Sequence, residues 1–132
     1  MTIEHVAIWT KNLKDLRDFY VSNFDAISSQ KYQNHSNGFE SYFLTFESGA
    51  RLELMQMPGI PENVNDTIEH QHLGLIHIAF GLPTRDEVDS KARELKARGI
   101  TILSGPRMTG DGYYEFEALD LDNNRIEVTS TQ

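Results

Sequence analysis

One short pattern occurs twice in the chain and constrains the fold more than any other feature. Residues 4–8 read Glu-His-Val-Ala-Ile, and residues 76–80 read Ile-His-Ile-Ala-Phe. A second pattern follows each copy: residues 51–54 read Arg-Leu-Glu-Leu, and residues 125–128 read Arg-Ile-Glu-Val. Self-similarity of this kind indicates a repeated structural unit, so we expect two copies of one module.

Each module opens with a histidine on an apolar strand and closes with a glutamate on another. His5 precedes Glu53 by 48 positions, and His77 precedes Glu127 by 50. Side chains alternate between the two faces of a strand, so these four residues should lie on the face opposite the neighbouring Val, Ile and Leu side chains.

Hydrophobic periodicity predicts the order β-α-β-β-β in both modules. In the first module we expect a helix over 13–23, a turn over 33–38, and strands over 3–9, 26–32, 41–46 and 51–57. In the second we expect a helix between Thr84 and Gly99, a loop over 105–112, and strands over 74–82, 100–103, 113–119 and 125–129. Capping boxes are expected at Asn12 with Asp15 and at Thr84 with Glu87, and Gly99 should end the second helix.

These elements describe an α+β protein of one domain over residues 1–132. We expect the first module over 1–57, a linker over 58–73, and the second module over 74–132. The linker contains two prolines and no hydrophobic periodicity.

Composition excludes several classes of function. The net charge of −8 disfavours nucleic-acid binding, which needs a basic face. No stretch approaches the ~20 apolar residues of a membrane span. The chain has no cysteine and no signal peptide at its start, so we expect a cytoplasmic protein without disulfides or thiolate metal ligands.

The repeated histidine and glutamate indicate a metal site. One such histidine or glutamate alone is usually structural or solvated. If the two modules pack about a pseudo-two-fold axis, however, two imidazoles and two carboxylates converge. Buried charges need pairing, and a divalent cation would provide it. Nitrogen and oxygen ligands suit Zn, Ni, Fe, Co or Mn, and the pattern does not choose among these metals.

These motifs resemble the vicinal oxygen chelate superfamily, which includes glyoxalase I, extradiol dioxygenases, and the fosfomycin- and bleomycin-resistance proteins. The resemblance covers essentially the whole chain. It rests on residues 4–8, 51–54 and 76–80, on Phe19-Tyr20, and on residues 120–127. In that last segment Leu121 and Asn123 replace the family's Pro and Gly. The resemblance implies paired βαβββ modules that form a cup-shaped mixed sheet with the helices outside.

The resemblance also implies a ligand set and a reaction. The implied metal ligands are His5, Glu53, His77 and Glu127, a set similar to that of bacterial glyoxalase I. A glyoxalase I-like lyase or isomerase acts on the hemithioacetal of a 2-oxoaldehyde and a thiol through a metal-chelated enediolate. Glu127 is the expected general base, with Glu53 as the second base or the group that returns the proton.

Two positions depart from the glutathione-dependent members of the family. Trp9 stands where they carry an arginine, and Met57 where they carry an asparagine, so neither can pair with a glutathione carboxylate. We expect a different thiol, with Trp9 and Met57 as apolar substrate contacts; core packing of Trp9 is an equal alternative. The 105–112 loop should act as a flap that brings Arg107 or Tyr114 near the substrate.

Two other functions remain open. A three-ligand enzyme, such as a ring-cleaving dioxygenase or a thiol transferase, would leave Glu53 without a metal. A non-enzymatic drug-binding resistance protein would use the same cup as a pocket. In each case the partner is a small molecule, and we expect a homodimer with sites formed within one chain or shared between two.

Overall fold

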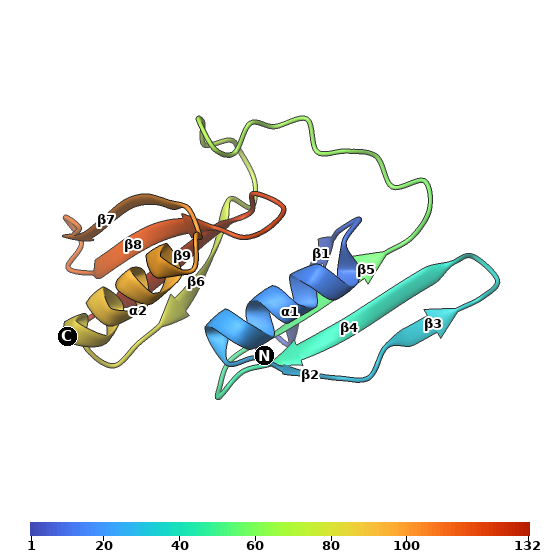
Figure 1. Ribbon diagram of the computed structural model, residues 1–132, viewed down its shortest axis with the longest axis horizontal. Helices are drawn as coiled ribbons and strands as arrows, with labels where there is room; N and C mark the ends of the chain where they lie inside the picture. The colour runs from blue at the N-terminus through green and yellow to red at the C-terminus, as the bar shows by residue number, and fades with distance from the viewer. The chain divides into compact units, whose positions relative to one another are not determined.

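The computed structural model describes residues 1–132 and divides into two compact units, Met1–Asn63 (unit 1) and Val64–Gln132 (unit 2). Each unit combines one mixed sheet with one helix, as Figure 1 shows. The expected α+β class and the β-α-β-β-β plan of both modules are confirmed, with one expected strand of the first module divided into two short strands. The assignment of residues 58–73 as a linker within one domain stays a prediction.

Unit 1 contains β1 (His5–Trp9), α1 (Leu13–Phe24), β2 (Ile27–Ser28), β3 (Tyr32–Asn34), β4 (Phe39–Thr45) and β5 (Arg51–Gln56). The sheet order is β1-β5-β4-β2, and β3 also pairs with β4. Only the β1–β5 pairing is parallel. The expected single strand over 26–32 is therefore two short strands, and the first residues of the expected 33–38 turn belong to β3.

Unit 2 contains β6 (His77–Gly81), α2 (Arg85–Ala97), β7 (Ile102–Met108), β8 (Tyr114–Leu119) and β9 (Arg125–Ser130). The sheet order is β6-β9-β8-β7, with a parallel β6–β9 pairing. The parallel strand pair at one edge thus occurs in both units, as the sequence repeat requires.

Each helix packs on one face of its own sheet. In unit 1 the buried side chains of α1 cover Leu44, Leu52 and Leu54. In unit 2 the buried side chains of α2 cover Phe116 and Val128. Burying a Leu or Phe side chain stabilises a fold by roughly 1.5–3 kcal/mol, so these layers anchor each sheet. The opposite face of each sheet carries the histidines and glutamates.

The two helices begin differently. The predicted capping box of α2 is confirmed: Thr84 Oγ1 accepts from the Glu87 backbone N–H at 3.3 Å, and Glu87 Oε2 accepts from Thr84 N at 3.0 Å. The predicted box at Asn12 is wrong, because the Asn12 side chain makes no capping bond. Gln56 Oε1, from the end of β5, accepts from the Leu13 N–H at 3.1 Å instead. A residue distant in sequence therefore supplies this cap.

The predicted 105–112 loop is also partly wrong. β7 continues to Met108 through two register shifts, and only then does the chain turn. One shift lies between Ile102 and Ser104, and the other, between Ser104 and Arg107, spans Gly105 and Pro106. Gly and Pro are read as strand breakers, but pairing with β8 accommodates them as an irregularity within the strand.

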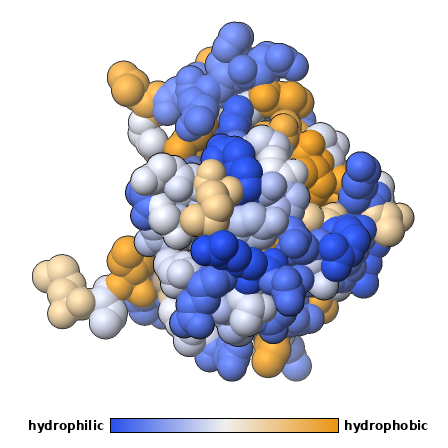
Figure 2. All heavy atoms as spheres, turned by 90° about the vertical axis from the view of Figure 1, so that its left-hand side faces the viewer, coloured by the Kyte–Doolittle hydropathy of each residue, from blue (hydrophilic) through white to orange (hydrophobic).

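Several large hydrophobic side chains remain exposed, and Figure 2 shows hydrophobic residues scattered among hydrophilic ones on the face toward the viewer. The most exposed in the segment between β5 and β6 are Val64, Leu73 and Leu75. No helix has the length and apolar character that crossing a membrane requires.

Candidate metal centre

The first histidine–glutamate pair is formed by the parallel strands β1 and β5. Ala7 is the register partner of Glu53, so His5, two residues before Ala7, lies on the same sheet face. His5 Nε2 lies 3.6 Å from Glu53 Oε2. The structure therefore brings together two residues that lie far apart in the sequence.

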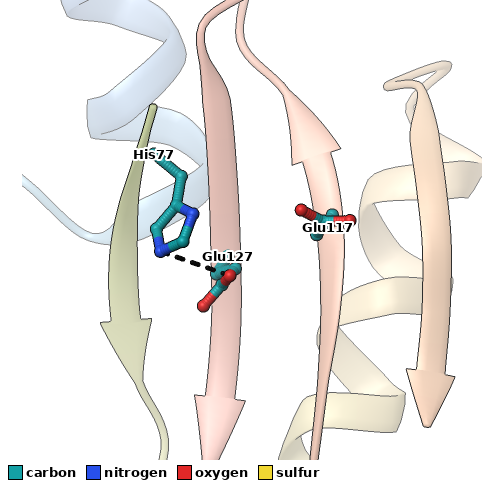
Figure 3. A group of neighbouring side chains, drawn as sticks. All are labelled: His77, Glu117 and Glu127. Carbon is teal, nitrogen blue, oxygen red and sulfur yellow. Dashed lines mark ion pairs between the residues drawn. The ribbon is translucent and has the colours of Figure 1, made fainter. Parts of the chain in front are cut away.

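The second pair repeats this arrangement in unit 2. Ala79 is the register partner of Glu127, and His77 Nε2 lies 3.3 Å from Glu127 Oε2 (Figure 3). Both glutamate side chains are only 15% exposed, whereas the His5 and His77 side chains are 41% and 36% exposed. Each pair thus has a partly buried carboxylate and an accessible imidazole.

A third side chain joins the unit 2 pair. Glu117 on β8 is the register partner of Glu127, and ligand atoms of His77, Glu117 and Glu127 all lie within 4.8 Å of one another. Figure 3 shows them on three neighbouring strands. Sequence reasoning missed Glu117. The signal was present, because alternation around buried Phe116 places Glu115 and Glu117 on the open face, but the strand register was needed to bring Glu117 opposite Glu127.

Two polar groups hold Glu117. Ser104 Oγ donates to Glu117 Oε2 at 2.9 Å, and Arg125 Nη1 lies 3.4 Å from Glu117 Oε1. Arg125 also donates to the carbonyl oxygens of Thr67 and Ile68, at 2.7 and 3.3 Å. These contacts orient the carboxylate on the open face.

Unit 1 has a different residue at the corresponding position. Phe43 is the register partner of Glu53, as Glu117 is of Glu127. The Phe43 ring packs edge-on against His5, with centroids 5.4 Å apart, and the Arg51 guanidinium lies 4.1 Å from its centroid. The unit 1 pair is therefore flanked by an aromatic ring where the unit 2 pair has a carboxylate.

His5 has a further partner in Glu4. One carboxylate oxygen of Glu4 contacts His5 Nδ1 and the other accepts from Arg51. The hydrogen bond to His5 and the contact with Arg51 lower the pKa of Glu4, which keeps it ionised. A carboxylate on Nδ1 favours the tautomer whose Nε2 lone pair is free, and Nε2 is the atom that faces Glu53.

The charge on Glu127 is unfavourable in the metal-free protein. Burial raises the pKa of Glu127; His77 lowers it, Glu115 and Glu117 raise it, and Arg107 lowers it. A divalent cation beside the carboxylates would stabilise the ionised form of Glu127.

The donor atoms fit a metal ion. With metal–ligand bonds of about 2.0–2.2 Å, neighbouring donors in a tetrahedral site lie about 3.4 Å apart. The two Nε2–Oε2 distances of 3.6 and 3.3 Å lie close to that value. Imidazole and carboxylate together suit Zn, Ni, Fe, Co or Mn. Each pair can supply half of a four-ligand site; the convergence of both pairs on one ion stays a prediction.

The four residues expected to contact substrate lie in different surroundings. Trp9 is 41% exposed, pairs in register with Met55 and stacks edge-on against Phe39, while Met57 directly follows β5. Arg107 is exposed, opposite Glu115.

Tyr114 lies on the face of β8 opposite to the face that carries Glu115 and Glu117. Its hydroxyl donates to Asp89 on α2 at 2.7 Å, and the bond raises the pKa of Tyr114. Strand alternation also places it with Phe116, on the helix-covered face. A substrate contact by Tyr114 stays a prediction.

Three solved structures illustrate the similarity of the fold. A glyoxalase/bleomycin resistance protein/dioxygenase domain from Frankia sp. EAN1pec has a TM-score of 0.81 at 15% identity, with 100% of this chain and 98% of that chain covered. The trypanothione-dependent glyoxalase I of Leishmania major has a TM-score of 0.76 at 18% identity, with 99% and 87% covered. The fosfomycin resistance protein FosX of Listeria monocytogenes, complexed with Mn(II) and sulfate, has a TM-score of 0.70 at 18% identity, with 98% and 92% covered.

Sequence comparison gives the family. No curated protein sequence matches the chain. The family model described as the Glyoxalase/Bleomycin resistance protein/Dioxygenase superfamily matches residues 2–128. The match spans both histidine–glutamate pairs and nearly the whole chain, so the protein belongs to this superfamily.

Proposed function

We propose that the protein is a divalent-metal-dependent lyase or isomerase of the glyoxalase I type. Many members of its superfamily are enzymes, and members bind small molecules. The observation that carries the proposal is the duplicated histidine–glutamate pair, with Nε2–Oε2 distances of 3.6 Å in unit 1 and 3.3 Å in unit 2. Four such donors count against a protein that only sequesters a ligand in a pocket.

In this proposal His5, Glu53, His77 and Glu127 hold the metal. The bound ion would supply Lewis-acid stabilisation for negative charge on two adjacent substrate oxygens. The imidazoles donate neutral nitrogen ligands through Nε2, and the carboxylates balance the charge of the cation.

Glu127 acts as the general base. It removes a proton from one carbon of the hemithioacetal, and the proton returns to the neighbouring carbon, so the reaction is a balanced isomerisation. The position of Glu127 beside His77, with 3.3 Å between Oε2 and Nε2, supports this role, because a general base must lie within reach of a substrate held at the metal. Glu53, at the equivalent position in unit 1, is the second carboxylate available for the return step.

The thiol in this proposal is not glutathione. Trp9 and Met57 offer neither a positive charge nor an amide to a carboxylate. Trp9, Phe39 and Met55 instead form apolar surface on the face that carries His5. This composition supports a less polar substrate. Arg107, whose charge lowers the pKa of Glu127, is the candidate for contact with a substrate oxygen. We further propose a homodimer as the working state.

Turnover by Glu127→Gln protein tests the proposal. Metal-loaded wild type should isomerise members of a panel of 2-oxoaldehydes combined with several thiols. Glu127→Gln should lower kcat at least 100-fold, as loss of general base catalysis typically does. The conservative Glu115→Gln variant should retain activity within roughly threefold. A Glu127→Gln variant as active as wild type would refute the assigned base, and a binder would show drug sequestration without turnover in both proteins.

A further inference from the structure

We infer that Glu117 is an additional metal ligand, and that His77, Glu117 and Glu127 together supply most of the affinity for a divalent cation. The inference builds on the metal site of the proposed function. It goes beyond that site by adding a ligand and by assigning most of the affinity to unit 2.

The geometry supports binding by all three side chains. Opposite donors in an octahedral site are about 4.2 Å apart and neighbouring ones about 3 Å, from bonds of about 2.1 Å. His77 Nε2 and Glu127 Oε2 lie 3.3 Å apart, and the ligand atoms of all three residues lie within 4.8 Å of one another. Small side-chain rotations would therefore bring the three atoms to the distances that a metal site requires. Glu117 and Glu127 are also direct register partners, and like charges directly opposite destabilise a sheet. A shared cation removes that repulsion.

Glu117 is oriented but not fully engaged by its protein contacts. Ser104 occupies one lone pair of Oε2 at 2.9 Å, and carboxylate oxygens each have two. Arg125 Nη1 is 3.4 Å from Oε1, longer than the usual charge-assisted bond of about 2.7–2.9 Å. The shortest hydrogen bond of Arg125 goes to the Thr67 carbonyl instead. If the only role of Glu117 were to neutralise Arg125, we would expect the two charged groups to lie closer together than 3.4 Å.

Unit 1 has no carboxylate at the position that corresponds to Glu117 in unit 2. Phe43 occupies it, and an aromatic ring offers no lone pair to a metal. The His5–Glu53 pair thus supplies two donors and the unit 2 cluster supplies three. Metal affinity should therefore depend more on unit 2.

Calorimetric titration of stripped, full-length protein with ZnCl₂ and MnCl₂ tests the inference. The variants are Glu117→Gln, Glu115→Gln, and the double variant His5→Ala/Glu53→Gln. Glu115 is the matched control because it lies two residues before Glu117 on the same strand and face, and its charge also acts on Glu127. The absorption spectrum of Co²⁺-loaded protein reports directly on the ligand set. Circular dichroism verifies that each variant folds.

We expect Glu117→Gln to raise Kd at least about tenfold, since loss even of an outer-shell partner costs 10- to 100-fold. It should also change the Co²⁺ spectrum. Glu115→Gln should change Kd less than about threefold with an unchanged spectrum, and the double variant should still bind one ion. Equal Kd values and spectra for Glu117→Gln and Glu115→Gln would overturn the inference, as would loss of binding in the double variant. The wild-type protein can turn over substrate normally in either case, so these results would overturn this inference without refuting the proposed function. Conversely, metal binding that depends on Glu117 without turnover on any substrate would refute the proposed function alone.

Discussion

Phe43 and Glu117 occupy the same position in the two units. Each is the cross-strand partner of the glutamate that faces the histidine, Glu53 in unit 1 and Glu127 in unit 2. The backbone plan is repeated, whereas the chemistry beside each pair is not. Phe43 makes the His5 surroundings more apolar, and Glu117 makes the Glu127 surroundings more acidic.

The raised pKa of Glu127 predicts a stability difference that depends on pH. Below the unfolded value of about 4.5 the carboxyl is protonated in both states and costs nothing. As pH rises through the folded pKa, the folded state binds more protons than the unfolded state, so stability falls. In EDTA, Glu127→Gln should therefore be more stable than wild type at pH 7.

Urea unfolding of both proteins at several pH values from 4 to 8 measures this difference. The advantage of Glu127→Gln should shrink toward pH 4. Added ZnCl₂ should reverse the order at pH 7, because the metal binds and stabilises the folded wild type. A difference that stays constant with pH would show that Glu127 ionisation has no part in it.

Glu4 should fix the tautomer of His5. In wild type its carboxylate contacts Nδ1, so ¹⁵N NMR should report a proton on Nδ1 of neutral His5. Glu4→Gln should shift the population toward Nε2–H and weaken metal binding by up to about tenfold, as loss of an outer-shell partner does. Glu62 is an exposed carboxylate of unit 1 that pairs with Lys11. The control variant Glu62→Gln should change neither the His5 tautomer nor the metal affinity. Identical His5 spectra in wild type and Glu4→Gln would exclude an orienting role.

The two helix caps predict unequal effects of alanine. Thr84→Ala removes a capping bond to the Glu87 N–H and should cost about 1 kcal/mol of unfolding free energy. Asn12→Ala should cost less than about 0.5 kcal/mol, because its side chain caps nothing. Chemical denaturation compares the two variants, and equal losses would contradict the capping geometry.

Gly105 should tolerate no side chain. Its φ of +82° is unfavourable for other residues, and a Cβ there would lie 2.5 Å from the Glu115 carbonyl oxygen. Gly105→Ala should destabilise the protein by about 2–4 kcal/mol, from left-handed strain and overpacking together. The nearby Gly110 has open space around it, so Gly110→Ala should stay within about 0.5 kcal/mol of wild type. Thermal unfolding distinguishes them, and a Gly105→Ala protein as stable as wild type would be inconsistent with this strand contact.

Most of the fold follows from local pattern and duplication. The strands that carry His5, Glu53, His77 and Glu127, both helices, and the Thr84 cap were predicted because alternation and capping are encoded in adjacent residues. The Gln56 cap of α1 and the passage of β7 through Gly105 were missed, since both depend on partners distant in sequence. Tertiary pairing there outweighs local preference.

In the candidate site, too, the features encoded in the sequence repeat were predicted, and those that depend on strand pairing were not. The sequence repeat identified each histidine and its glutamate, and the structure brings each pair together. Glu117 required the β8–β9 register, which periodicity alone does not specify. Periodicity also does not show that the alternation along β8 directs the Tyr114 hydroxyl to Asp89 on α2.

The metal centre is tested by titrating the stripped protein with Zn²⁺, Ni²⁺ and Mn²⁺, with the His77→Ala variant and the exposed-histidine control His70→Ala alongside. We expect about one ion per chain in wild type and in His70→Ala, and a large loss of affinity in His77→Ala. A folded wild-type protein that binds none of these ions would contradict the metal centre and the enzyme function built on it.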